Sequence, residues 1–242
     1  MLKPNMKNIN FPLAIGLGLL LFTSSCDMTV APPAEISAEK FWKTRNDAFL
    51  ALNACYAMMP AMDIWDEMTT DNAHSHKPWE GPYELIQQNG ISVEYNQGYS
   101  FADIRIFNNF IEKVETVEVE DTLKERMRAE VRFLRAFSYL NLTSKFGKVP
   151  LITQVLNYDA PLLQRDDQEK VRQFILDELQ AISTTLPDRY AGGLLQETGR
   201  ITRGAALALR ARAALYFGNF AEAEKSAKAV MESGIYELFT VN

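Results

Sequence analysis

The amino-acid sequence predicts an all-α fold built from helical hairpins, and three observations lead to this prediction. Apolar residues recur at steps of three and four along most of the chain after residue 38, which is the spacing of one helix face. No window alternates apolar and polar residues well enough to indicate a sheet strand. Two helical segments near the C-terminus, residues 202–217 and 220–232, are separated only by Gly218 and Asn219. Such a short connection makes the two helices antiparallel neighbours.

The first 25 residues are typical of an export signal. Lys3 and Lys7 precede an apolar run over residues 11–22, and small residues and then Cys26 follow it. The run is shorter than the roughly 20 residues that a membrane-spanning helix needs. A cysteine directly after the small residues is what a lipoprotein signal requires. We therefore predict cleavage after residue 25 and attachment of lipid to Cys26; a plain secretory signal with an incidental cysteine is the alternative.

The composition of the chain excludes several classes of protein. Acidic residues outnumber basic ones by 31 to 25, and loss of the leader with its two lysines changes the formal net charge from −6 to −8. Nucleic-acid binding requires clustered Lys and Arg, so we expect no nucleic-acid partner. Cys55 is the only cysteine after Cys26. A disulfide framework is therefore excluded, and the apolar helical surroundings of Cys55 predict a buried side chain.

Residues 26–38 are expected to form a flexible tether, because they contain two adjacent prolines and few large apolar groups. A helical pattern begins near Ser37 and ends near Pro60. We place the folded domain at residues 39–242.

Residues 61–100 differ from the rest of the domain. They are rich in tryptophan and tyrosine and show no sustained periodicity, which predicts long loops with short helical pieces. Aromatic-rich loops on a helical scaffold are frequent binding sites, since flat rings pack against sugars while polar groups bind hydroxyls. We select five candidate ligand-binding residues from this segment, each of which could also have only a structural role: Trp65, Asn72, His74, Trp79 and Tyr83.

Helical periodicity returns after residue 100. The pattern predicts helices over residues 101–114, 122–146 and 168–185, followed by the C-terminal pair. In the longest helix an apolar stripe faces inward, made of Leu123, Met127, Val131, Leu134, Phe137 and Leu140. Its arginines lie mostly off this stripe and predict a solvated or ion-paired face, with partner docking as the alternative: Arg128, Arg132 and Arg135. Asp166 and Glu169 are a possible capping pair for the helix that follows.

The C-terminal helix pair matches the tetratricopeptide hairpin pattern. Small residues fall where two antiparallel helices must approach closely: Ala211, Ala214, Ala223 and Ala227. We predict tetratricopeptide-like repeats over about residues 122–234. Stacked hairpins need neighbours to cover their faces, yet the sequence ends ten residues after the last helix without a polar capping helix. We therefore expect that the C-terminal half of a longer protein is missing.

Four segments together resemble the SusD-like (RagB-like) family of outer-membrane nutrient-binding lipoproteins: residues 41–59, 99–114, 128–153 and 199–238. The third is the most specific, because its helix ends in the aromatic-Gly-x-Val-Pro-Leu pattern of the family. The segments occur in the family's order. Family members are about twice as long as this chain, which agrees with the expected missing portion.

The resemblance implies a cell-surface binding protein without a cofactor, and not an enzyme. Such a protein is anchored by lipid to the outer membrane and caps a SusC-like TonB-dependent transporter, to which it delivers an oligosaccharide or similar nutrient. No family motif covers the five candidate ligand-binding residues, which depend on composition and loop context alone.

Other interpretations remain open. A tetratricopeptide scaffold lipoprotein for outer-membrane assembly would bind only protein. An exported hydrolase could use the carboxylates of Asp63, Asp66 and Glu67. His74 and His76 could bind a metal with Asp66 or Asp71, but their spacing is not that of a zinc protease, and we predict no metal site.

Overall fold

The structure is a computed structural model, which describes residues 41–59, 67–68, 70–74, 76–77, 83–90, 92, 98–157, 159–190 and 197–239. The chain divides after Phe41 into two units, and the fold described below is that of the second unit, residues 42–242. The cysteine expected to carry lipid, Cys26, lies outside the described residues.

The described part of the chain is all-helical, as predicted, and contains no strand. Its helices are α3 (Arg45–Tyr56), α4 (Tyr83–Gln87), α5 (Ala102–Lys113), the 3₁₀ turn η2 (Val114–Thr116), α6 (Asp121–Phe146), α7 (Gln168–Ile182), α8 (Arg203–Tyr216) and α9 (Phe220–Glu232). Among these residues, no helix is both long and apolar enough to cross a membrane.

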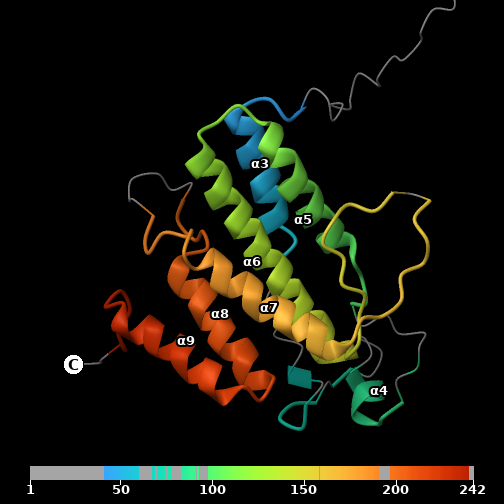
Figure 1. Cartoon of the computed structure of the whole chain (residues 1–242). Helices are drawn as coiled ribbons and strands as arrows, with labels where there is room; N and C mark the ends of the chain where they lie inside the picture. Colours follow the sequence, from blue (N-terminus) through green and yellow to red (C-terminus); the bar gives the residue numbers. More distant parts are fainter. Residues whose placement is uncertain are drawn as a thin grey trace, which may run out of the picture. The chain divides into compact units, whose positions relative to one another are not determined.

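Helix α6 is the centre of the fold. Figure 1 shows it passing between α3 and α5 on one side and the α7–α8 pair on the other, and it packs against all four. Of its predicted apolar stripe, Met127, Val131, Leu134 and Leu140 are buried, while Leu123 and Phe137 are partly buried. Burial extends beyond the stripe because neighbours cover several faces, so Glu130, Arg135 and Tyr139 are also buried.

Two predicted helix features need correction. The helix expected from near Ser37 to Pro60 is interrupted, because residues 42–44 form a turn after the helical Phe41 and α3 begins at Arg45; residues 37–40 lie outside the described chain. Thr44 and Asp47 close a capping box there: Asp47 N donates to Thr44 Oγ1 at 3.2 Å and Thr44 N donates to Asp47 Oδ2 at 2.8 Å. Asp166 does not cap α7, whose N-cap residue is Asp167. Instead, the Asp166 carboxylate accepts from Leu151 N at 2.8 Å.

The remaining helices add successive hairpin-like layers, since α6 packs on α7, α7 on α8 and α8 on α9. Gly218 adopts a φ of 77° in the α8–α9 turn, and Asn219 caps α9 by accepting from Glu222 N. Ala214 is buried as predicted, but Ala227 is exposed, because Ser226 takes the buried position on α9.

Candidate functional site

The five candidate ligand-binding residues are only partly described. Trp65 and Trp79 lie outside the described residues, as do Asp63 and Asp66 of the hydrolase interpretation. His74 is exposed, and Tyr83 is the half-buried first residue of α4. The proposed roles of these residues therefore stay predictions.

Asn72 belongs to a tight exposed turn. Its Nδ2 donates to Glu67 Oε1 at 2.8 Å, and its backbone N donates to Thr70 Oγ1 at 3.2 Å. The Thr70 hydroxyl in turn donates to Glu67 O at 2.7 Å. These hydrogen bonds use the amide of Asn72 and the carboxylate of Glu67 within residues 67–72, so both side chains stabilise the turn.

Metal binding and thiol chemistry find no support in the described part of the chain. It contains no group of three His, Cys, Asp or Glu side chains able to hold a metal ion, so Asp71 does not complete a site with His74 and His76. Cys55 is buried as predicted, with 1% of its surface exposed. Burial raises the pKa of its thiol to about 12, which keeps the thiol protonated at neutral pH.

The end of the aromatic-rich segment is fixed to the helical body by Tyr99. Its ring makes edge contacts with Phe101 at 5.3 Å and with Phe146, the last residue of α6, at 5.0 Å between centroids. The guanidinium of Arg165 lies 5.7 Å from the same ring. The segment therefore joins the scaffold at the C-terminal end of α6.

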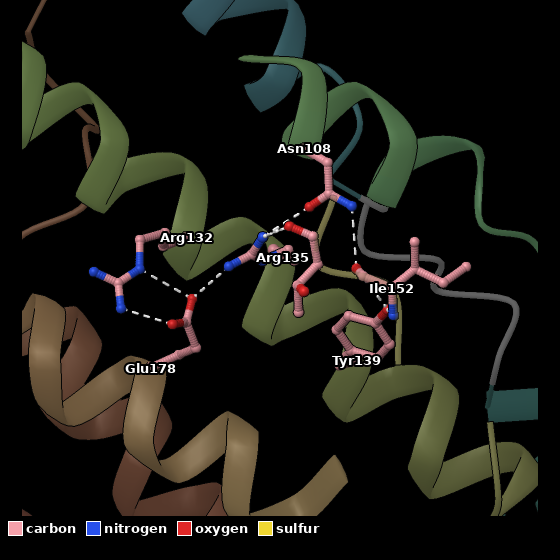
Figure 2. A network of polar contacts seen from close by, with 7 residues as sticks. Asn108, Arg132, Arg135, Tyr139, Ile152 and Glu178 are labelled. Carbon is pink, nitrogen blue, oxygen red and sulfur yellow. Dashed lines mark hydrogen bonds and ion pairs between the residues drawn. The ribbon is translucent and has the colours of Figure 1, made fainter. Parts of the chain in front are cut away.

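A polar network holds the chain that follows α6. Its side chains come from three helices and are drawn in Figure 2: Asn108 of α5, Arg132 and Arg135 of α6, and Glu178 of α7. Arg132 Nε and Nη2 donate to Glu178 at 3.0 and 2.6 Å, and Arg135 Nη2 donates to Glu178 Oε2 at 2.8 Å. Arg135 Nη1 also donates to Asn108 Oδ1 at 2.7 Å. The ion-paired interpretation of these arginines is confirmed.

The carboxyl of Glu178 titrates below its ordinary range. Burial of Glu178 opposes ionisation, but the hydrogen bonds and charges of Arg132 and Arg135 outweigh it and lower the pKa. Glu178 is therefore ionised at neutral pH and joins α6 to α7.

The network binds the backbone of residues 150–154 rather than their side chains. Asn108 Nδ2 donates to the carbonyls of Ile152 and Gln154, both at 3.1 Å, and Arg135 Nη1 donates to Thr153 O at 3.3 Å. Ile152 N donates to the hydroxyl of Tyr139 at 2.6 Å (Figure 2). Residues 150–154 begin within the Gly147 to Leu151 motif, which was the most specific sequence feature.

A second charged cluster lies about one turn earlier along α6, around Glu130, whose side chain is fully buried. Tyr56 of α3 donates to Glu130 Oε2 at 2.6 Å, and Arg200 Nη1 donates to the same oxygen at 3.2 Å. Arg126 Nε lies 3.5 Å from Glu130 Oε1. Arg200 Nη2 donates to Asn53 Oδ1 at 3.1 Å, so the cluster ties the segment before α8 to α3 and α6.

Burial raises the pKa of Glu130, although the Tyr56 hydroxyl and the two arginines act in the opposite direction. The backbone of the following residue completes the tie, because Ile201 N donates to the Tyr56 hydroxyl at 3.0 Å. Sequence reasoning missed this cluster: Arg126 and Glu130 have the i, i+4 spacing of an ordinary surface pair, and Arg200 lies 70 residues further on.

Comparison with known proteins identifies the family. The profile described as "Starch-binding associating with outer membrane" of the SusD-like proteins matches residues 27–215. The chain belongs to the SusD-like family. It is 28% identical to SusD-like protein P38 of Formosa agariphila over 96% of this chain and 47% of that protein. It is 33% identical to the starch-binding protein SusD of Bacteroides thetaiotaomicron over 57% of this chain and 24% of that protein.

Solved structures agree with this assignment. A SusD-like protein from Bacteroides fragilis superposes with a TM-score of 0.75 at 28% identity, covering 86% of this chain and 42% of that chain. The chain spans about half the length, or less, of the curated relatives it matches. The resemblance seen in the sequence is thereby confirmed, and partial coverage agrees with an N-terminal portion of a SusD-like protein.

Proposed function

We propose that this chain is the N-terminal, helical part of a cell-surface lipoprotein that binds an oligosaccharide and delivers it to a SusC-like TonB-dependent transporter in the outer membrane. In this role it binds and presents its ligand and catalyses no reaction. The observation that carries the proposal is the family match over residues 27–215, whose description names starch binding and the outer membrane.

The fold supports binding by a rigid scaffold. The aromatic-rich segment is fixed through Tyr99 to the C-terminal end of α6, next to a loop whose backbone is held by Asn108 and Arg135. Contacts that fix the end of a binding segment in advance reduce the ordering cost of ligand binding, which favours affinity. We propose that Trp79, Tyr83, Trp65, Asn72 and His74 contribute to that surface.

Affinity electrophoresis of the purified chain on gels containing starch, laminarin, xylan or mannan tests glycan binding. We expect retardation by at least one polysaccharide and loss of much of it in Trp79→Ala. Tyr216→Ala is the matched control, since Tyr216 is a 59% exposed aromatic residue on α8 and is not one of the proposed ligand-binding residues. If no polysaccharide retards the chain, the protein-binding scaffold interpretation takes its place.

Membrane attachment and the transporter require a second experiment. Radiolabelled palmitate should be incorporated into the wild-type chain and not into Cys26→Ala. A large β-barrel protein should co-purify with the lipidated chain from detergent extracts of the native host. Absence of label from the wild type would contradict the anchor.

A further inference from the structure

Helix α9 is attached to the fold mainly through polar contacts. Among the described helices it packs extensively only on α8, at the edge of the helical layers (Figure 1). The whole of α9 is described, and Ser226 is its only buried residue, while Phe220 and Met231 are 69% and 74% exposed. A helix of 13 residues is marginal by itself in water, and burial of an apolar face usually stabilises it. Because α9 fully buries no large apolar side chain, other contacts must keep it docked.

Arg210 of α8 supplies the first of these contacts, near the α8–α9 turn. Its side chain is 8% exposed. Its Nη1 donates to Ser226 Oγ at 2.9 Å and to the carboxylate of Glu222, and its Nε donates to Leu176 O of α7 at 3.2 Å. Glu222 and Ser226 both lie in the first half of α9, so Arg210 holds this half of the helix against α8.

The second contact lies beyond the other end of α9. Ser233 ends the helix, and Gly234 turns the chain with a φ of 64°, which glycine adopts without steric cost. The chain then brings Tyr236 against the first turn of α8. A β-carbon at position 204 would overlap the ring and hydroxyl of Tyr236, so the absence of a side chain at Gly204 makes room for the tyrosine.

Two hydrogen bonds fix Tyr236 and its neighbour in this position. The Tyr236 hydroxyl is 3.0 Å from Oγ1 of Thr202, the residue that caps α8. Arg189 Nη2 donates to Ile235 O at 3.0 Å. Thr202 and Arg189 both precede α8 in the chain, so the segment after α9 is tied to the connection between α7 and α8. We call Tyr236, Gly204 and Thr202 the latch.

We propose that the latch controls the docking of the second half of α9, residues 227–232. When Tyr236 leaves Gly204, this half separates from α8, while Arg210 keeps the first half in place. A freed helical end this short does not remain helical in water, so its backbone amides become open to exchange. The latch is a conformational device at the edge of the fold; it goes beyond the proposed glycan-binding function and does not depend on it.

Native-state hydrogen exchange of the full chain measures this opening residue by residue. In the wild type we expect the amides of residues 227–232 to exchange at least about a hundredfold faster than the buried amides of α6, because a local opening costs less than unfolding of the core. Equal protection of the two regions would contradict the proposal.

Gly204→Ala is the sharpest test, since alanine is the better helix former. If no latch exists, the substitution stabilises α8 and leaves exchange at residues 227–232 unchanged or slower. If the latch exists, the new β-carbon displaces the Tyr236 ring, and these amides should exchange about tenfold faster, a factor that corresponds to about 1.4 kcal/mol. Tyr236→Ala removes the same contact without adding a β-carbon and should give the same acceleration, which keeps the test intact if Gly204→Ala does not fold.

Two further variants separate the latch from a general loss of stability. In the double variant Gly204→Ala/Tyr236→Ala the acceleration should not exceed that of Tyr236→Ala, because both changes remove one contact. Arg132→Leu weakens the core through the α6–α7 ion pair and should leave exchange at residues 227–232 within about twofold of the wild type. Additive accelerations in the double variant, or an equal acceleration in Arg132→Leu, would overturn the latch.

Discussion

The two charged clusters on α6 use similar parts and have opposite properties. Glu178 and Glu130 each face two arginines, yet the pKa of Glu178 is lowered and that of Glu130 is raised. The side chain of Glu178 is 12% exposed and accepts three hydrogen bonds of 2.6–3.0 Å from its arginines. Glu130 is fully buried, and its arginines lie at 3.2 and 3.5 Å. The comparison teaches that burial and contact length, rather than the number of arginines, decide the direction of the pKa shift.

The largest effect is expected from Arg135→Leu. The side chain of Arg135 is 7% exposed. In the variant, Asn108 Oδ1, Thr153 O and Glu178 Oε2 each lose the hydrogen bond that Arg135 donates. Glu178 keeps its hydrogen bonds from Arg132, but Asn108 Oδ1 and Thr153 O lose a buried donor. Each lost buried partner costs about 1–3 kcal/mol, so we expect the free energy of unfolding in urea to fall by about 3 kcal/mol.

Arg132→Leu is the matched control for this change. Arg132 pairs with the same carboxylate but is 29% exposed, and Glu178 would keep Arg135. We expect a loss of about 1 kcal/mol. Equal losses in the two variants would contradict the assignment of Arg135 as the central residue of the network.

Two tyrosines, the partly buried Tyr56 and the buried Tyr139, sharpen the comparison. Each hydroxyl accepts a hydrogen bond from a loop amide, Tyr56 from Ile201 N and Tyr139 from Ile152 N. Tyr56 also donates to a carboxyl group. We expect Tyr56→Phe to cost about 2 kcal/mol and Tyr139→Phe about 1 kcal/mol. Amide hydrogen exchange should rise near Ile201 in the first variant and near Ile152 in the second. Exchange that rises equally at both places would exclude local anchoring.

The opposite pKa shifts predict opposite pH dependences. The stabilisation from Glu178 is present above the ordinary glutamate pKa of 4.5 and is lost as the pH falls through its lowered value. The contribution of Glu130 is complete below pH 4.5 and is lost as the pH rises through its raised value. The stability difference between wild type and Glu178→Gln should therefore grow with rising pH, and that for Glu130→Gln should shrink. Urea titrations from pH 3 to pH 8 measure both slopes, and parallel slopes would refute the comparison.

The smallest effect is expected for Arg128, which is more exposed than Arg132 and Arg135. Arg128 pairs with Glu115, and their side chains are 36% and 49% exposed. Because solvent screens such a pair, Arg128→Ala should change the free energy of unfolding by at most about 0.5 kcal/mol. A loss as large as that of Arg135→Leu would show that burial does not order the series.

Much of the fold could be predicted because its signals are local. Apolar spacing located α5 to α9, and Gly147 and Gly218 marked two helix ends correctly. The break before α3 was missed because the Thr44 to Asp47 capping box was overlooked, although its residues could have been found in the sequence.

The polar clusters could not be predicted in the same way, because their partners are distant along the chain. Arg200 is 147 residues from Asn53, and Arg135 is 43 residues from Glu178. On sequence spacing alone, a charged residue of α6 that faces solvent cannot be distinguished from one that is covered by α3 or α7. The candidate site depended on residue composition, and two of its five residues, Trp65 and Trp79, fall outside the described chain.

The way in which Asn108 and Arg135 hold residues 152–154 has a consequence for divergence within the family. Both side chains donate hydrogen bonds to backbone carbonyl oxygens, which every amino acid possesses. The side chains of residues 152–154 can therefore be exchanged while the path of the loop stays the same. Only proline at 151 or 152 would remove a needed amide. Residues 152–154 are thus free to vary in side-chain chemistry while the path of their backbone stays constant.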